Sequence, residues 1–162
     1  MKASVLGHII TDYVNSKGNV VSPKKLQKLV FYVEAWHLVH FDNSIVDENF
    51  QAWVHGPVVP ELYQELKEFG FNNISVVNDD LDNASERINK NARENNLSND
   101  QLDLIFSVLD KYAPLNSFEL EMLSHSEDPW LNARGELAPH SRCNTIIDKG
   151  FIKKYYASQL AS

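Results

Sequence analysis

The feature that most constrains this fold is a segment, residues 23–41, that is apolar on nearly every side. Ser22 can cap a helix that starts here, and Pro23 occupies the first turn, where its missing N–H costs nothing. A helix that is apolar all round is usually buried, so we expect residues 23–41 to form the central helix of the core. The side chains at helical spacing are Leu26, Leu29, Val30, Val33, Trp36, His37 and His40, with Phe31, Tyr32, Ala35, Leu38 and Val39 opposite.

Shorter helices are predicted around this central one from apolar periodicity and from start and stop residues. Residues 50–55 alternate in the manner of a short strand, which Gly56-Pro57 would end by a sharp turn into the next helix. The predicted fold is therefore mainly α, a compact multi-helix domain with a small minor β element near 50–55. The further predicted helices are residues 3–16, a helix from Pro60 to Gly70, helices after the capping boxes Ser98–Gln101 and Asn116–Glu119, a short one from Asp128-Pro129 to Gly135, and one capped by Asp148.

Residues 77–100 differ in composition from the rest of the chain, with many asparagines and aspartates and few large apolar side chains. Such a stretch buries too little apolar surface to hold a fixed structure. We therefore predict a polar, flexible surface loop with at most one weak helical turn. The whole chain, residues 1–162, is close to the usual size of one domain, so a single domain with one core is expected.

The chain carries a formal net charge of −7 at pH 7, which argues against nucleic acid as a partner because duplex binding needs a basic surface. An acidic surface instead suits a basic protein partner. Cys143 is the only cysteine, so no internal disulfide is available and a reducing compartment is expected. The N-terminal residues lack a signal-peptide apolar core, and no apolar run approaches the roughly 20 residues of a membrane span. We expect a cytoplasmic protein without a membrane partner.

One group of residues is a candidate metal site. His37 and His40 lie one helical turn apart, and Glu34 lies a turn before His37, a spacing that zinc sites use. The pattern is not the H-E-x-x-H of zinc enzymes, no ligand beyond these is marked by spacing, and histidines satisfied by hydrogen bonds explain it more simply. We expect no bound metal and no other cofactor.

A second group contains residue types that occur in hydrolases. Ser124 and His125 are followed by acidic residues, but residues adjacent in sequence rarely point at one another as a triad requires. The end of one helix followed by the start of another at Asp128-Pro129 explains the same residues without catalysis. No nucleophile motif and no glycine-rich phosphate loop is present in the sequence. We expect a protein that is not an enzyme.

Lysines cluster at the start of the central helix, at Lys24, Lys25 and Lys28. A helix N-terminus with lysines can bind phosphate or carboxylate groups. The alternative, that these residues are only the solvated end of the helix, is the simpler interpretation.

Three sequence blocks go beyond a generic helical pattern. They are residues 22–37 (SPKKLQKLVFYVEAWH), 52–63 (AWVHGPVVPELY) and 123–130 (LSHSEDPW), and in this order and spacing they resemble the Panacea domain of the SocA/GepA-like antitoxin family. Ala35 stands where the family often has glycine, and Ser124 where it often has threonine. The residues that carry the resemblance are Leu26, Gln27, Lys28, Trp36, His37, Trp53, Gly56, Pro57, Tyr63, His125, Pro129 and Trp130.

The resemblance implies an antitoxin-like, phage-associated module that binds and neutralises a cognate protein toxin. Some family members look like adaptors that deliver a toxin to a protease, and the family has no established catalytic residues. The residues themselves leave two alternatives, a DNA-binding regulator of a mobile element and a small metalloenzyme that uses His37 and His40. We expect Trp36 and Trp130 in the core and leave Trp53 open. If the motif residues are mostly structural, the toxin is contacted elsewhere, for example by residues 77–100.

Overall fold

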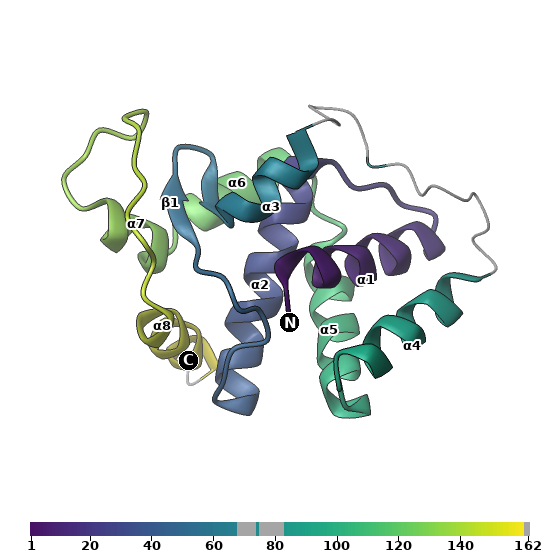
Figure 1. The fold of residues 1–162 in the computed structure, drawn as a ribbon. Coiled ribbons are helices and arrows are strands. Elements are labelled where there is room, and N and C mark those ends of the chain that lie inside the picture. The colour runs from purple at the N-terminus through teal and green to yellow at the C-terminus, as the bar shows by residue number, and fades with distance from the viewer. Residues whose placement is uncertain (68–73, 75–82, 161–162) are drawn as a thin grey trace.

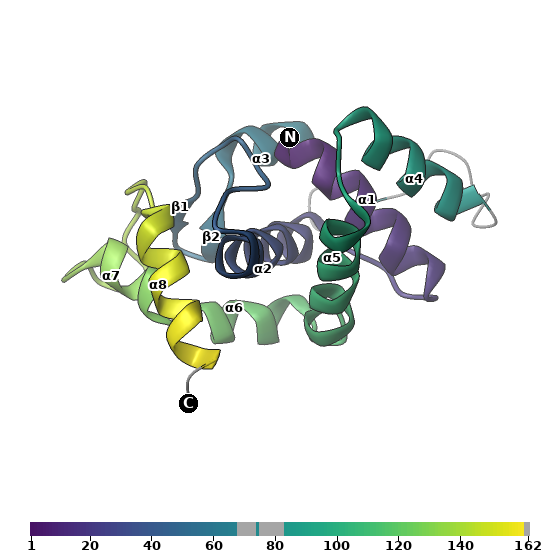
Figure 2. The same cartoon turned by 90° about the horizontal axis from the view of Figure 1, so that it is seen from below.

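A long central helix, α2 (Pro23–Phe41), organises the molecule. In the computed structural model, which describes residues 1–67, 74 and 83–160, every residue from Leu26 to Leu38 is buried. Helices α1, α3, α5, α6 and α8 and strand β2 all contact α2. Figure 2 looks nearly along α2 and shows α1, α5, α6 and α8 around it. The prediction of a buried central helix over residues 23–41 is confirmed.

The prediction of a mainly helical fold is also confirmed, with eight helices and one two-stranded sheet in the described part of the chain (Figure 1). None of the described helices combines the length and apolarity needed to cross a membrane. Besides α2, the elements are α1 (Ala3–Ser16), β1 (Gln51–Trp53), β2 (Gly56–Val58), α3 (Pro60–Leu66), α4 (Ala84–Glu94), α5 (Asn99–Tyr112), α6 (Ser117–His125), α7 (Asp128–Arg134) and α8 (Lys149–Leu160).

Most helix ends lie where the capping residues predict them. The Ser22 hydroxyl accepts a hydrogen bond from the Lys25 amide at 3.2 Å, and Ser98 and Asn116 each form a complete capping box. Asp148 accepts from the Phe151 amide at 2.9 Å at the start of α8. The predicted stop at Gly70 lies outside the described residues.

The minor β element is a hairpin and not a single strand. Strands β1 and β2 pair antiparallel with Trp53 opposite Gly56, and the chain turns at Val54 and His55. The prediction that Gly56-Pro57 forms the turn is therefore wrong: both residues lie in β2, because a two-residue loop already reverses the chain before them. The free edge of β1 is covered by residues 145–147, with Ala52 N–H donating to the Thr145 carbonyl at 3.0 Å.

Helix α4 occupies much of the stretch that the composition predicted to be a loop. Ala84, Ile88 and Ala92 recur every four residues, are buried, and lie on the side of α4 that packs against α1. The Arg87 guanidinium donates to the Asp12 carboxylate of α1 at 2.9 and 3.0 Å. The loop prediction is wrong for residues 84–94, because two alanines and Ile88 form a narrow apolar stripe that the overall polar composition of the segment hides. Residues 77–82 of the predicted loop lie outside the described residues.

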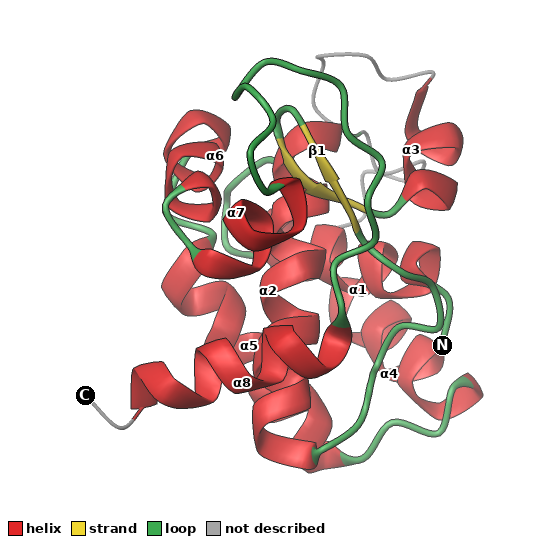
Figure 3. Cartoon of the chain, turned by 90° about the vertical axis from the view of Figure 1, so that its left-hand side faces the viewer, coloured by secondary structure: helices red, strands yellow, loops and turns green. Residues whose placement is uncertain are grey.

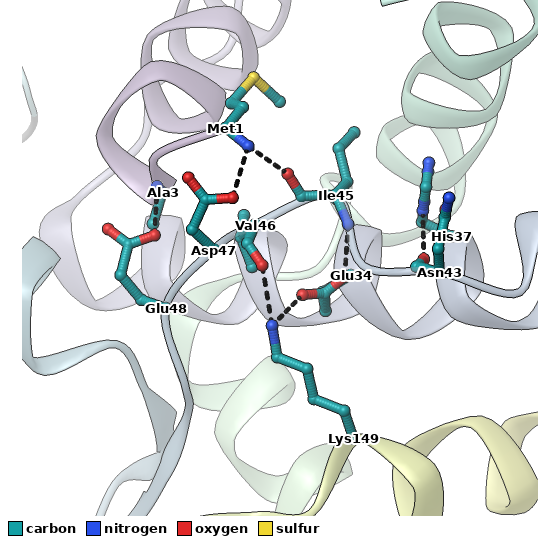
Figure 4. A network of polar contacts seen from close by, with 10 residues as sticks. All are labelled: Met1, Ala3, Glu34, His37, Asn43, Ile45, Val46, Asp47, Glu48 and Lys149. Carbon is teal, nitrogen blue, oxygen red and sulfur yellow. Dashed lines mark hydrogen bonds and ion pairs between the residues drawn. The ribbon is translucent and has the colours of Figure 1, made fainter.

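A buried carboxylate ties the start of α8 to the middle of α2. The Glu34 side chain is fully buried and accepts from the Ile45 amide and from the Lys149 ammonium, each at 2.9 Å (Figure 4). Lys149 also donates to the Val46 carbonyl at 2.8 Å. These contacts hold the segment after α2 between two helices and leave Glu34 no unpaired charge.

Candidate functional site

The three sequence blocks meet in space beside the first half of α2. Strand β2 and helix α6 both contact α2, and the hairpin also contacts α6 and α7. Figure 3 shows the hairpin, α6 and α7 together at one end of the molecule. The residues that connect the blocks form what we call the motif junction: Gln27, Lys28, Trp53, Gly56, Pro57, Ser124, His125 and Trp130.

Gln27 fastens α2 to the residue that precedes α3. Its side-chain amide donates to the Val59 carbonyl at 3.1 Å, and its oxygen accepts from the Val59 amide at 2.9 Å. Both groups are buried, so the pairing satisfies two backbone groups that water cannot reach. The Gln27 side chain thereby pairs with the Val59 backbone through one donated and one accepted hydrogen bond, as a neighbouring strand would.

Lys28 is buried beneath the hairpin and is only 1% exposed. Its ammonium donates to the Pro57 carbonyl at 3.1 Å. Burial, together with the smaller effect of the Lys24 charge, lowers the pKa of Lys28 to about 7, while Glu121 acts in the opposite direction. The interpretation of Lys24, Lys25 and Lys28 as a solvated helix end is wrong for Lys28, because the hairpin covers this face of α2.

Gly56 is required where β2 crosses the Lys28 side chain. Its φ of +111° lies in the region that favours glycine. A Cβ at this position would lie 2.5 Å from Lys28 Cε and 2.9 Å from Ser124 Oγ. The glycine therefore allows α2, β2 and α6 to approach one another closely.

Trp130 joins α7 to the hairpin. Its indole N–H donates to the Trp53 carbonyl at 2.7 Å, and the His125 ring stacks on it with ring centroids 3.9 Å apart. The Arg134 guanidinium lies 4.8 Å from the same indole ring and donates to the Ala52 carbonyl at 2.8 Å. Trp130 thus contacts an imidazole and a guanidinium as well as the β1 backbone, and these contacts fix α7 against β1.

His125 contributes an imidazole whose Nε2 is buried and has no hydrogen-bond partner among the described residues. Burial lowers the pKa of His125, and the cations of Lys28 and Arg134 act in the same direction; the Glu121 charge and a hydrogen bond with the Val54 backbone oppose this, but the pKa is lowered overall. The described surroundings therefore favour a neutral ring that stacks on Trp130.

Most of the residues that carry the resemblance lie inside the molecule. Trp36 and Trp130 belong to the core, as predicted, and the Trp36 indole donates to the Tyr112 hydroxyl at 2.9 Å. Trp53, which the sequence left open, is half-buried, and Tyr63 is 41% exposed. The buried members are Leu26, Gln27, Lys28, Trp36, His37, Gly56, Pro57, Pro129 and Trp130, and His125 is half-buried.

The candidate metal ligands point to different partners. The His37 Nδ1 lies 2.7 Å from the Asn43 carbonyl and its Nε2 lies 3.0 Å from the Gln101 amide, so both ring nitrogens are engaged. Figure 4 shows the Glu34 carboxylate turned to Ile45 and Lys149, and His40 is exposed. Within residues 1–67, 74 and 83–160, no group of three or more histidine, cysteine or acidic side chains is arranged to hold a metal ion.

The candidate hydrolase residues are likewise separated. The Ser124 hydroxyl donates to the Glu121 carbonyl at 3.0 Å and not to an imidazole. Glu127 accepts from the hydroxyls of Tyr32 at 2.6 Å and Tyr156 at 2.9 Å. Burial raises the pKa of Glu127, and the two hydrogen bonds oppose that effect. The carboxylate therefore joins α2 to α8 and forms no triad with Ser124.

A hollow of about 1240 Å³ opens beside the motif junction, and we call it the basic hollow. Trp53 and Tyr63 line it and meet edge to face with ring centroids 5.0 Å apart. No Asp or Glu occurs among the described residues that line it. The basic and imidazole side chains that line it are Lys24, Lys28, Lys67, Arg142, His55 and His140.

One carboxylate stands next to this hollow without lining it. Glu121 of α6 pairs with Lys24 at 2.9 Å and with His55 at 2.7 Å. Burial raises the pKa of Glu121, but the hydrogen bonds and charges of Lys24 and His55 outweigh it and lower the pKa overall. The sequence did not reveal the hollow, because its lining comes from four separate segments, and only the Lys24–Lys28 cluster was a signal.

Comparison with known proteins agrees with the motif blocks. A family model described as "Antitoxin SocA-like, Panacea domain" matches residues 26–131, from the second turn of α2 into α7. Curated proteins and solved structures give no significant match. The matched segment contains the whole motif junction and covers well over half of the chain. The chain therefore belongs to the SocA-like antitoxin family and carries its Panacea domain.

Proposed function

We propose that this chain is an antitoxin that binds a cognate protein toxin directly and thereby blocks the toxin's working surface. The family match over residues 26–131 carries the proposal. The burial of most motif residues supports it, because such residues maintain a scaffold and leave the outer surface for a partner. On this proposal the molecule needs no catalytic group of its own.

The charge of the chain supports a basic toxin. The net charge of −7 favours encounter with a positively charged partner. Helix α5 adds a local feature, because Asp100, Asp103 and Asp110 are all exposed and follow one another at helical spacing. A basic toxin would be steered toward this side of the molecule.

Co-expression with the product of the neighbouring gene tests the proposal. We expect rescue of growth and a complex that survives purification. A Leu29→Asp variant, which places a charge at a fully buried core position, serves as the folding-deficient control and should give neither result. A well-folded wild-type protein that neither rescues growth nor binds the toxin would contradict the proposal.

The same system separates direct masking from delivery to a protease. Masking predicts that purified antitoxin inhibits purified toxin when no protease is present, and that toxin levels in cells stay constant. Delivery to a protease predicts that toxin levels fall and that rescue disappears in a protease-deficient strain. Inhibition with the purified pair supports masking, and its absence together with protease-dependent rescue supports the adaptor role.

A further inference from the structure

The basic hollow concentrates positive charge in a protein that is acidic as a whole. Four of the chain's 15 lysines and arginines line it together with two histidines, whereas none of the described lining residues is acidic. This separation of charge is not expected for a surface that only contacts water, where charges of both signs normally alternate. The hollow is therefore complementary to an anionic ligand.

Two of these cations are available to a ligand. Arg142 is exposed, and Lys67 lies over the Tyr63 ring at 5.9 Å. Neither pairs with a carboxylate among the described residues. Lys24, by contrast, is paired with Glu121, and the buried Lys28 ammonium bonds to Pro57. Within the part of the chain that the structure describes, Lys67 and Arg142 thus supply the positive charge that pairs with no carboxylate.

The hollow also offers an apolar surface alongside these cations. Trp53 is half-buried, with its indole N–H held by the Gln51 side chain at 2.7 Å, and Tyr63 meets it edge to face. An apolar side chain of a ligand that packs on an aromatic pair of this kind is removed from water, and this burial stabilises the complex. The volume of about 1240 Å³ exceeds the roughly 300–1,000 Å³ of small-molecule pockets, which favours an extended segment.

We propose that the basic hollow binds an acidic peptide segment of the protein partner, with an apolar side chain on Trp53 and Tyr63 and carboxylates on Lys67 and Arg142. The proposal rests on the proposed function only for the identity of the partner, the toxin. An acidic segment within a basic toxin would complement the hollow, while the rest of the toxin would complement the net negative charge of the chain as a whole. The hollow then sets which toxin segment is recognised and in which orientation.

Calorimetric titration with a capped peptide of sequence EELEEL tests the proposal on the full chain. We expect saturable binding to the wild type and binding at least about tenfold weaker to a Lys67→Glu/Arg142→Glu double variant, since reversal replaces attraction by repulsion. A Lys90→Glu/Arg93→Glu variant makes the same change in charge on α4 and should bind as the wild type does. No binding to the wild type, or equal losses in both variants, would overturn the proposal.

Cys143, the only cysteine, lines the hollow and reports where the peptide binds. At a peptide concentration about twice the dissociation constant, alkylation of Cys143 should slow about threefold, because only the free fraction reacts. A peptide of sequence KKLKKL should give no protection. Binding in the calorimeter without protection of Cys143 would place the peptide elsewhere and overturn the proposal.

Two further measurements, binding of other anions and a comparison of peptide binding with growth rescue, identify the ligand class and separate this inference from the proposed function. Tripolyphosphate or a single-stranded oligonucleotide that binds as tightly as the peptide at equal charge would overturn the assignment to a peptide. Growth rescue by the wild type without peptide binding would remove this inference and leave the antitoxin function intact. Peptide binding by a protein that never neutralises the toxin would contradict the antitoxin function instead.

Discussion

At the scale of single residues, Lys28 shows how strongly the fold changes the chemistry of a side chain. A lysine at the polar start of a helix is ordinarily solvated, yet this one lies under β2 with the Pro57 carbonyl as its hydrogen-bond acceptor. Burial lowers its pKa to about 7, so folding works against the charged form. The protonation of Lys28 therefore couples the stability of the motif junction to pH.

We expect the free energy of unfolding to rise between about pH 7 and pH 9. Unfolded Lys28 keeps its proton up to its ordinary pKa of 10.5, whereas folded Lys28 loses it near 7. In this interval the unfolded state binds more protons, so each pH unit adds up to about 1.4 kcal/mol. Below about pH 7 both states are protonated, and this contribution no longer varies. Urea unfolding at pH 6, 7, 8 and 9 measures the slope.

A Lys28→Met variant should lose this slope, because methionine fills similar space and does not titrate. Lys154→Met, at an exposed position of α8, is the matched control and should keep it. Measurements stop at pH 9, since burial also raises the pKa of Tyr32, Tyr112 and Tyr156, and their titration destabilises the folded state at higher pH. Equal slopes in the wild type and in Lys28→Met would show that Lys28 is not the titrating group.

Gly56 provides a second prediction about a single residue. Gly56→Ala adds a methyl group 2.5 Å from Lys28 Cε in a buried space, besides the strain of a positive φ. Gly18→Ala is the matched control, because Gly18 has a φ of +82° but no atom within 4 Å of the added carbon. We expect the control to lose about 1 kcal/mol of unfolding free energy and Gly56→Ala about 2–4 kcal/mol. Equal losses in urea unfolding would mean that the close approach imposes no steric limit.

At the scale of whole elements, the helices that were predicted correctly are those whose signals are local. Caps such as Ser22, Ser98 and Asn116 act within one turn, so their effect is visible in the sequence itself. Helix α4 lacked such a signal: its first residue follows Asn83, whose side chain makes no capping hydrogen bond. Its stability comes from the surface of α1, which is distant in sequence.

Ile88→Ala tests this dependence of α4 on α1. Ile88 is the largest of the three buried residues of α4 and is 5% exposed, so its truncation leaves a cavity against α1. We expect a loss of about 2–4 kcal/mol in unfolding free energy, with faster amide hydrogen exchange in α4. Asn89→Ala, at the neighbouring exposed position, should stay within about 0.5 kcal/mol of the wild type. Unchanged exchange in Ile88→Ala would show that α4 does not need this contact.

At the scale of the whole molecule, the sequence could predict the blocks of the motif junction but not their assembly. Tight turns and caps depend on neighbours, whereas the bond from Trp130 to Trp53 joins residues 77 positions apart, and that from Lys28 to Pro57 joins residues 29 apart. The burial of Lys28 and the lining of the basic hollow depend on such distant contacts. Residue types alone therefore made Lys28 look like a solvated lysine and α4 like a loop.

The family match begins inside α2 and ends inside α7, and this predicts that residues 26–131 do not fold alone. α1 buries Leu6, Ile9 and Ile10, and Tyr156 of α8 lies against the ring of Phe31. Burial of each such side chain contributes about 1.5–3 kcal/mol to the free energy of unfolding, which is only about 5–15 kcal/mol for a whole domain. Loss of several of these side chains therefore removes an amount comparable to the entire stability.

We therefore expect the fragment to lack a cooperative urea transition and near-ultraviolet circular dichroism, both of which the full chain should show. Mixing the fragment with a peptide of residues 1–25 should restore neither, because α8, which packs along α2, is still missing. A fragment that unfolds cooperatively would place the whole stabilising core inside the matched segment and make α1 and α8 additions to a scaffold that is already complete.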